Sequence, residues 1–399
     1  MSNLLVAQSG GPTAAINATL AGVVKQAVNE KDIKKIYGLV NGIEGIFANN
    51  FILLNDINTE LLKKTPAAYL GSCRYKLPDY QKDSKVYEEI FSFLEKNNIK
   101  YFLYIGGNDS MDTVTKLSLY AREKNKNISF IGVPKTVDND LSITDHTPGF
   151  GSAAKYVATT VNEIALDCYV YKSKSVTIVE IMGRHAGWLT AAAVLSRGKN
   201  QKAPHLIYLP EAAFSLEKFK DDINALFEKG ISNVIVAISE GIKDKNGRFI
   251  CETEDAKLDA FGHKSLSGSG KILENYIKNE LGCKARAVEL NVSQRCAGHI
   301  LSKTDIDESV KIGREGVKHA IKGKTGEMMI FKRISDSPYK MKISSADLTK
   351  IANEEKTIPE KHIKNGNDVD KKLVAYLKPL IEGEVKQEYK NGIPLYLHR

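Results

Sequence analysis

The sequence predicts an α/β protein with two lobes, each built on a mostly parallel sheet. Its 399 residues suit two or three domains at about 150 residues each. With 42% hydrophobic and 26% charged residues, the composition is that of an ordinary globular protein with a packed core. Short apolar runs alternate with stretches of helical length along most of the chain. Strands that are apolar on both faces and alternate with helices are typical of parallel sheets.

The expected strands are short apolar runs at residues 3–8, 35–40, 101–107, 128–133, 176–182, 205–209 and 233–239. The expected helices have the matching length and periodicity and cover residues 12–28, 110–124, 151–166, 187–195 and 215–229. Helices on both faces of a sheet make each lobe a three-layer, Rossmann-like unit. Ligands of such units bind at the carboxyl ends of the strands, so we expect the active site in the cleft between the lobes.

Basic residues exceed acidic ones, but they are scattered along the chain. Lys and Arg number 57 and Asp and Glu 48, which gives a net charge of +9. The excess suits an anionic ligand, and its scatter is typical of a solvated surface. Binding of nucleic acid, the alternative, would need a continuous basic patch, and no motif of interleaved basic and aromatic residues supports it. We therefore expect no nucleic-acid partner.

The cysteines and the first residues indicate a cytoplasmic protein. Five cysteines without a Cys-x-x-Cys pair fit reduced thiols better than disulfides or a zinc site. The first residues lack a basic segment followed by a long apolar core, and no run reaches about 18 apolar residues. We expect neither a signal peptide nor a membrane span.

A glycine turn, Gly10 and Gly11, follows the first expected strand and opens a helix. Glycine lets backbone N–H groups approach a phosphate, and a helix N-terminus favours an anion. Neither a Gly-x-Gly-x-x-Gly motif nor a Walker A loop is present here. A plain tight turn between a strand and a helix is the alternative, so the glycine pair alone indicates little.

A second turn follows the strand that begins at residue 101, and polar residues come after its glycines. Gly107 is followed by Asn108, Asp109 and Ser110, with a helix expected to begin near Met111. Oxygen ligands at the carboxyl end of a strand suit a phosphate and its Mg²⁺. The alternative is that Asp109 and Ser110 serve only as helix N-caps.

The strongest candidate is the polar string after the strand at 128–133. It contains Lys135, Thr136, Asp138 and Asp140. Of two carboxylates so close, one can take a proton while the other orients it or a metal ion. Solvated turn residues are the usual reading of such carboxylates, and the buried strand before them makes that reading less attractive here.

Arginines that could clamp phosphate groups stand in similar places. Arg184 belongs to Met182-Gly183-Arg184, at the end of the strand at 176–182, and its guanidinium offers a fork of donors that matches phosphate oxygens. Together with three further arginines, it suggests a substrate with more than one phosphate group. These three are Arg74, Arg286 and Arg295, the last two on either side of a strand-like stretch at 287–293.

Taken in order, these motifs resemble those of the 6-phosphofructokinases, and more narrowly their pyrophosphate-dependent branch. The resemblance covers nearly the whole chain. It rests on Gly10-Gly11-Pro12, Gly71-Ser72-Cys73-Arg74, Gly106-Gly107-Asn108-Asp109-Ser110, residues 134–140, Met182-Gly183-Arg184, Pro210-Glu211, Arg286 and Gln294-Arg295. It implies reversible, Mg²⁺-dependent transfer of a phosphoryl group from pyrophosphate to the 1-hydroxyl of fructose 6-phosphate. The product, fructose 1,6-bisphosphate, would serve both glycolysis and gluconeogenesis.

The resemblance also implies roles for single residues. Asp138 resembles the base for the sugar 1-hydroxyl, with Thr136 and Asp140 around the reacting centre. Arg74 and Arg184 resemble the cations that neutralise the moving phosphoryl group. The implied sugar site comprises Thr136, Asp138, Met182, Gly183, Arg184 and Glu211, with Arg286 and Arg295 on the 6-phosphate. Arg286 is implied to come from a neighbouring subunit, hence a homodimer or homotetramer.

The implied donor site decides between pyrophosphate and ATP. Asp109 stands where ATP-using members have a glycine, so its side chain would crowd and repel ATP. Lys135 stands where many bacterial ATP enzymes have glycine, and a cation there can hold pyrophosphate. Mg²⁺ is implied at Asp109 and at Asn108, where relatives have an aspartate. The donor residues are Gly10, Gly11, Gly107, Asp109, Ser110 and Lys135.

Two positions of the 6-phosphate site depart from the family's pattern. Val292 replaces a frequent His or Tyr, and Ser175 replaces an arginine of the bacterial ATP enzymes. An ATP-dependent 6-phosphofructokinase and a non-catalytic phosphosugar-binding regulatory subunit are the alternative functions. The presence of Asp138 argues against the second.

Both lobes are expected to be discontinuous in sequence. The donor lobe should comprise residues 1–149, completed by about 295–345, and the fructose 6-phosphate lobe residues 150–294, completed by about 346–399. Two polar stretches interrupt the alternation of strands and helices. Residues 242–270 are interpreted as an insertion or long loop, and residues 350–372 as an exposed helical or irregular segment.

Overall fold

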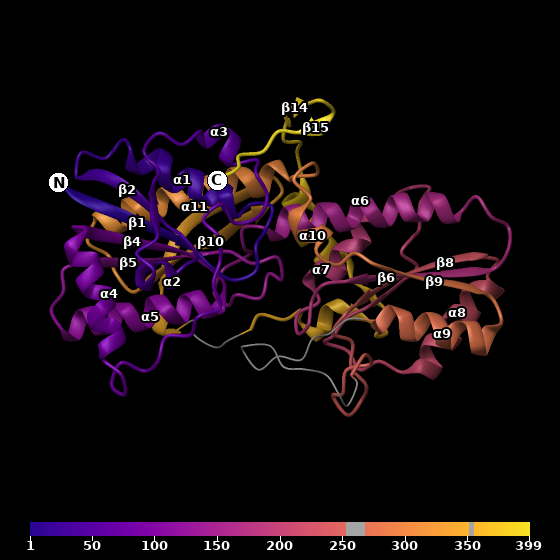
Figure 1. Cartoon of the computed structure of the whole chain (residues 1–399). Helices are drawn as coiled ribbons and strands as arrows, with labels where there is room; N and C mark the ends of the chain where they lie inside the picture. Colours follow the sequence, from indigo (N-terminus) through magenta and orange to yellow (C-terminus); the bar gives the residue numbers. More distant parts are fainter. Residues whose placement is uncertain (253–267, 351–354) are drawn as a thin grey trace.

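The computed structural model of the protein describes residues 1–252, 268–350 and 355–399. Figure 1 shows two lobes side by side, each with a central sheet flanked by helices. The predicted α/β class with two lobes is therefore confirmed. Most of the predicted insertion at 242–270, and a small part of the polar stretch at 350–372, lie outside the described residues.

The first lobe is built on a seven-stranded sheet in the order β11-β10-β5-β4-β1-β2-β3. The central pairs are parallel, while β3 and β11 join the two edges as antiparallel strands. The bounds are β1 (Ser2–Gln8), β2 (Ile33–Leu39), β3 (Phe51–Leu53), β4 (Ile99–Gly106), β5 (Ser129–Pro134), β10 (Glu327–Asp336) and β11 (Tyr339–Asp347).

Helices cover both faces of this sheet. On one face lie α1 (Ile16–Ala27) and α11 (Lys303–Ile321), and on the other α4 (Lys85–Lys96) and α5 (Asn108–Glu123). The helices α1 and α11 pack backbone to backbone, because a Cβ on Gly22 would lie 2.1 Å from Val310 O. Two short helices, α2 (Glu44–Phe47) and α3 (Thr59–Leu62), lie in the connections.

The second lobe is built on a fully parallel sheet in the order β7-β8-β6-β9. One apolar core fills the face under α8 (Leu216–Glu228) and α9 (Ser269–Leu281). A second core fills the face under α6 (Phe150–Cys168), α7 (Trp188–Ala191), the 3-10 helix η1 (Ala192–Ser196) and α12 (Lys371–Leu377). The strands are β6 (Ser175–Ile181), β7 (Leu206–Tyr208), β8 (Asn233–Ser239) and β9 (Lys284–Glu289).

The chain after β11 serves both lobes. Leu373 and Leu377 of α12 pack into the second lobe, whereas the Leu397 N–H donates to Thr65 Oγ1 of the first lobe at 2.9 Å. The remaining elements are α10 (Ser293–Cys296), η2 (Leu348–Lys350), η3 (Glu360–His362), β12 (Ile363–Lys364), β13 (Asp368–Val369), η4 (Lys378–Ile381), β14 (Tyr389–Lys390) and β15 (Ile393–Pro394). No helix within the described ranges is long and apolar enough to cross a membrane.

All seven predicted strands are present within a few residues of their expected ends. Three of the predicted helices differ from the prediction, the first because α1 begins at Ile16 and not at residue 12. The helix expected near Met111 begins at Asn108, and the one expected over 187–195 is divided into α7 and η1. The strand-like stretch at 287–293 is placed too late, because β9 ends at Glu289. Arg286 therefore lies inside a strand.

Candidate active site

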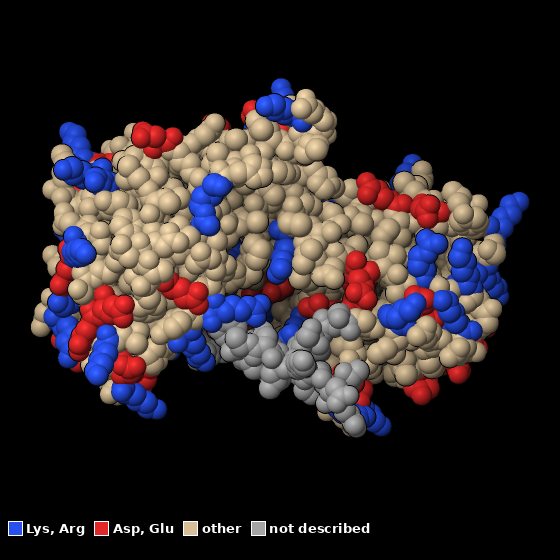
Figure 2. Space-filling model, viewed as in Figure 1, with Lys and Arg blue, Asp and Glu red and all other residues tan. Residues whose placement is uncertain are grey.

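Three loops of the first lobe meet at the carboxyl ends of β1, β4 and β5. These strands are neighbours in a parallel sheet, so their carboxyl ends share one edge. The Lys135 N–H donates to Gly106 O at 2.9 Å, and Lys135 Nζ donates to Gly11 O at 2.6 Å. Figure 2 shows the surface hollowed between the lobes, with basic and acidic side chains gathered at the hollow.

Gly10 allows this close approach. Its φ of +76° lies in the left-handed region, and a Cβ there would stand 3.2 Å from Lys135 Nζ. Ser72 Oγ donates to Gly10 O at 2.7 Å, which ties the turn before Arg74 to the same loop. Arg74 itself is exposed. The predicted donor loops and the turn that carries Arg74 are thus adjacent.

Lys135 is a buried cation, with 2% of its surface exposed. Burial lowers its pKa to about 8, although Asp138 and Asp140 act in the opposite direction. A buried ammonium is costly unless an anion pairs with it. An anionic ligand beside Gly11 would therefore be held by this side chain and would raise its pKa again.

For pyrophosphate, the phosphoryl donor that the sequence motifs imply, we expect the KM to rise with pH above about 8. Below this pH Lys135 is protonated in the free enzyme, whereas at higher pH binding must first return a proton to it, at a cost of up to tenfold per pH unit. Steady-state kinetics from pH 6.5 to 9.5 would measure this rise. The variant Lys135→Met should show a higher KM without that rise, and wild-type and variant profiles of the same shape would contradict the prediction.

The second loop starts α5 and brings oxygen atoms to the same edge. Gly107 is the N-cap of this helix, which puts Asp109 in the first turn. The Asp109 side chain is exposed, whereas Ser110 is buried. The Asn108 Nδ2 atom donates to Asp140 Oδ2 at 3.4 Å. Asn108 and Asp109 are therefore presented next to the loop that follows β5.

The third loop carries the partly buried carboxylates Asp138 and Asp140. Thr136 Oγ1 accepts a hydrogen bond from the Asp138 N–H at 3.1 Å, which fixes the turn. Burial raises the pKa of Asp138 to about 7, and the negative charges of Asp140 and Glu240 add to this effect. Burial also raises the pKa of Asp140. A carboxyl group with a pKa near neutrality is suited to exchange protons with a substrate hydroxyl.

The second lobe faces these loops with the turn after β6. Gly183 has φ +139°, and a Cβ there would lie 2.6 Å from Ala186 O. Its N–H donates to Glu240 Oε1 at 3.3 Å, and the Met182 N–H donates to Gln294 Oε1 at 3.3 Å. Arg184, the next residue, is partly buried.

Glu240 was missed by the sequence analysis. It follows β8 directly, and burial raises its pKa to about 7, against the nearby cations Arg184 and Arg295. The carboxylate thus joins both arginines and the Asp138 loop in one electrostatic cluster. A single acidic residue at the end of an apolar strand was the available signal, which is weaker than the two carboxylates and the lysine that singled out the loop after β5.

The two predicted 6-phosphate arginines lie apart. Arg295 belongs to α10, and its Nη1 atom lies 3.4 Å from the position that a Cβ on Gly11 would take. Arg286 is exposed on the edge strand β9 and lines a cavity of about 210 Å³ that also contains Ser175 and Lys284. Of these two arginines, Arg295 is the one that lies near the loops of the first lobe in the same chain.

The Glu211 side chain binds mainly to backbone N–H groups of the second lobe. Its Oε1 atom accepts hydrogen bonds from the N–H groups of Gly187 at 2.8 Å and Ile358 at 2.9 Å. Its Oε2 atom is buried and has no hydrogen-bond partner among the described residues. Its contact with a sugar stays a prediction.

Comparison with known proteins gives consistent matches over nearly the whole chain. The profile of the family described as "Phosphofructokinase" matches residues 3–311. A relative from Xanthomonas campestris pv. campestris, named pyrophosphate–fructose 6-phosphate 1-phosphotransferase, is 42% identical over 99% of this chain and 95% of its own. A crystal structure of pyrophosphate-dependent phosphofructokinase from Nitrosospira multiformis is 37% identical, with a TM-score of 0.90 over 99% of this chain and 96% of that one.

Proposed function

Because the chain belongs to the phosphofructokinase family, we propose that it transfers a phosphoryl group from pyrophosphate to fructose 6-phosphate. The products are fructose 1,6-bisphosphate and orthophosphate, and the reaction runs in both directions. The observation that carries the proposal is the cluster of buried Lys135 with partly buried Asp138 and Arg295 between the lobes. The relatives named above support pyrophosphate as the donor.

Asp138 is the proposed general base. The 1-hydroxyl oxygen of the sugar forms a bond to the terminal phosphorus of pyrophosphate, and the bridging P–O bond breaks to release orthophosphate. The proton of the hydroxyl passes to Asp138, whose pKa of about 7 suits both directions of the reaction. In this proposal Thr136 and Asp140 hold its loop, and Arg74 and Arg184 offset charge on the phosphoryl group.

Asn108 and Asp109 fit a magnesium ion. They offer oxygen atoms at the N-terminus of α5, and Mg²⁺ is held in such sites by one or two protein oxygens together with phosphate oxygens and water. When bound, the ion would neutralise charge on the donor. Lys135 and the Gly10-Gly11 turn would hold the other side of the donor.

The sugar is proposed to lie against the second lobe. Met182, Gly183, Arg184 and Glu211 form this pocket, and we add Glu240 because it lies beside Gly183 and both site arginines. The five free cysteines are consistent with the cytoplasm as the enzyme's location.

Initial rates with fructose 6-phosphate and either pyrophosphate or ATP test the function. Preference for ATP would move it to the ATP-dependent class, and no turnover with either would favour a regulatory subunit.

We propose that Arg286 completes the 6-phosphate site of a neighbouring subunit, in at least a homodimer. Its position on an edge strand, away from Arg295, supports this role. Mixing Arg286→Ala with Asp138→Asn dimers should form heterodimers with one intact site, and recover about a quarter of wild-type activity. Mixing Arg184→Ala with Asp138→Asn is the control, because both residues serve one subunit's site. No recovery in the first mixture would contradict the shared site.

A further inference from the structure

A lysine from the polar stretch at 350–372, Lys356, lies partly buried between the loop after β5 and the second lobe, although the sequence predicted an exposed segment there. The Lys356 N–H donates to Asp140 O at 2.7 Å, next to a bridge between Glu355 and Leu141. In the other direction, the Trp188 indole N–H donates to Lys356 O at 2.8 Å. The backbone of Lys356 therefore joins the loop after β5 to the second lobe.

The ammonium group of Lys356 points into the same loop. Its Nζ atom donates to Asn139 Oδ1 at 3.2 Å, Thr144 O at 3.1 Å and Asp145 O at 2.7 Å. An ammonium has three donors and no acceptor, so these bonds account for its full capacity. All three acceptors belong to the segment that begins with Asp138.

Asn139 is the residue on which this arrangement converges. It has φ +53°, a conformation that costs a non-glycine residue free energy unless its surroundings hold it. Its side-chain nitrogen donates to Tyr376 Oη at 3.1 Å, and that hydroxyl donates to Asp145 O at 2.6 Å. Lys356 and Tyr376 thus hold Asn139, between the two carboxylates, from both sides.

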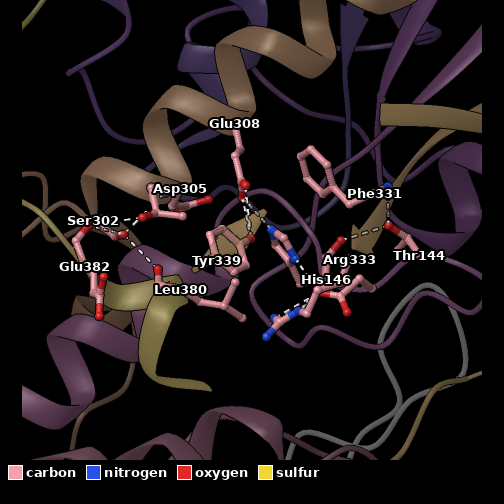
Figure 3. A network of polar contacts seen from close by, with 12 residues as sticks. Thr144, His146, Ser302, Asp305, Glu308, Phe331, Arg333, Tyr339, Leu380 and Glu382 are labelled. Atoms are coloured by element: carbon pink, nitrogen blue, oxygen red, sulfur yellow. Dashed lines mark hydrogen bonds and ion pairs between the residues drawn. The ribbon is translucent and has the colours of Figure 1, made fainter. Parts of the chain in front are cut away.

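The far end of the loop is anchored by a second polar network, which meets the bonds of Lys356 and Tyr376 at Asp145. Arg333 donates to Asp145 Oδ1 at 3.0 Å, and His146 lies between Asp145 at 2.9 Å and Glu308 at 2.8 Å. Figure 3 shows His146 and Tyr339 meeting Glu308 of α11, with Arg333 close by. This network fixes residues 145 and 146 and also holds Thr144, whose Oγ1 atom accepts a hydrogen bond from the Phe331 N–H at 3.0 Å. Lys356 adds the bond to Asn139, between the two carboxylates.

We propose that Lys356 is a positioning residue, which holds the loop of Asp138 and Asp140 in place against the sugar-binding lobe without touching either substrate. The inference rests on the proposed function, in which Asp138 must meet the sugar hydroxyl. A displacement of about 1 Å at a reacting centre can cost about a hundredfold in rate. Lys356 therefore acts on the rate of the chemical step more than on substrate binding.

The variant Lys356→Met tests the proposal through kinetics. We expect kcat to fall by about 10- to 100-fold, with KM for both substrates within about threefold of wild type. Lys356→Arg, which keeps the charge and the donors, should recover part of kcat. Lys364→Met, an exposed lysine of β12, is the matched control and should leave kcat unchanged. An unchanged kcat in Lys356→Met would overturn the proposal, and so would a rise in KM alone.

Two further measurements separate positioning from general stability. In the Asn139→Ala background, Lys356→Met should have little additional effect on kcat, because both changes release the same loop. Hydrogen exchange of residues 136–144 should speed up in Lys356→Met, while that of β8 stays slow. Exchange does not depend on turnover, so it decides the role of Lys356 even if the proposed function fails. Unchanged exchange in the loop would overturn the proposal.

Discussion

Replacing Asp138 by Asn lowers kcat by about 10²- to 10⁴-fold, the usual range for loss of a general base. The amide keeps the size of the carboxyl group but cannot accept the proton of the sugar hydroxyl. Because the pKa of Asp138 is raised to about 7, wild-type kcat/KM for fructose 6-phosphate, measured at saturating pyrophosphate, should rise with pH as this group loses its proton, and level off above neutrality. Initial rates from pH 5.5 to 8.5 would show this acidic limb, and the variant should lack it.

Asp221→Asn, an exposed position on α8, is the control and should match wild type in rate and pH profile. The KM for fructose 6-phosphate should change little in Asp138→Asn, because the sugar's phosphate and the second lobe supply most of its binding. A variant that keeps a tenth or more of wild-type kcat would assign the proton transfer to another group. Asp140 and Glu240 would then be the next carboxylates to replace.

Replacing Asp109 by Gly lets the enzyme use ATP. Asp109 is exposed in the first turn of α5, beside the Gly107 cap, where it would meet the nucleotide portion of ATP with bulk and like charge. Removing an element that acts against the wrong ligand shifts specificity even without new favourable contacts. We expect the ratio of kcat/KM for ATP to that for pyrophosphate to rise by about a hundredfold or more. Parallel initial-rate assays with each donor would measure it.

Asp109→Asn separates the two causes, because it removes the charge and keeps the bulk. Activity with pyrophosphate should fall in both variants, since the proposed Mg²⁺ site loses a carboxylate. A wild-type enzyme that prefers ATP would refute the argument from Asp109. It would leave the fold and the sugar site unaffected.

The sequence was most informative where apolar strands end in polar loops. Such strands are easily found because both of their faces are buried, and parallel strands place their carboxyl ends at one edge. Gly11, Lys135 and Asn108 were therefore expected near one another, and the structure places them on adjacent loops. The same reasoning, applied once more, would have found Glu240.

Residues that join the site from distant parts of the chain could not be predicted in this way. Lys356 lies in a polar stretch whose composition is that of a solvated segment, and only the folded chain shows its bonds to Asn139 and Asp145. The hairpin of β10 and β11 was also missed. Its outer strand alternates between partly buried and exposed residues at 339–342, so it lacks the continuous apolar run that marked the other strands.

The order of strands in the first sheet also governs how the chain is made. Strands β1 to β5 leave the ribosome early, whereas β10, which pairs with β5 at Ile131 and Gly132, follows only after the entire second sheet. Until then β5, which is fully buried in the finished protein, is an apolar edge open to pairing with other chains. The nascent chain is therefore most open to mispairing during synthesis of the second lobe, and β5 gains its last neighbour only when β10 has been made.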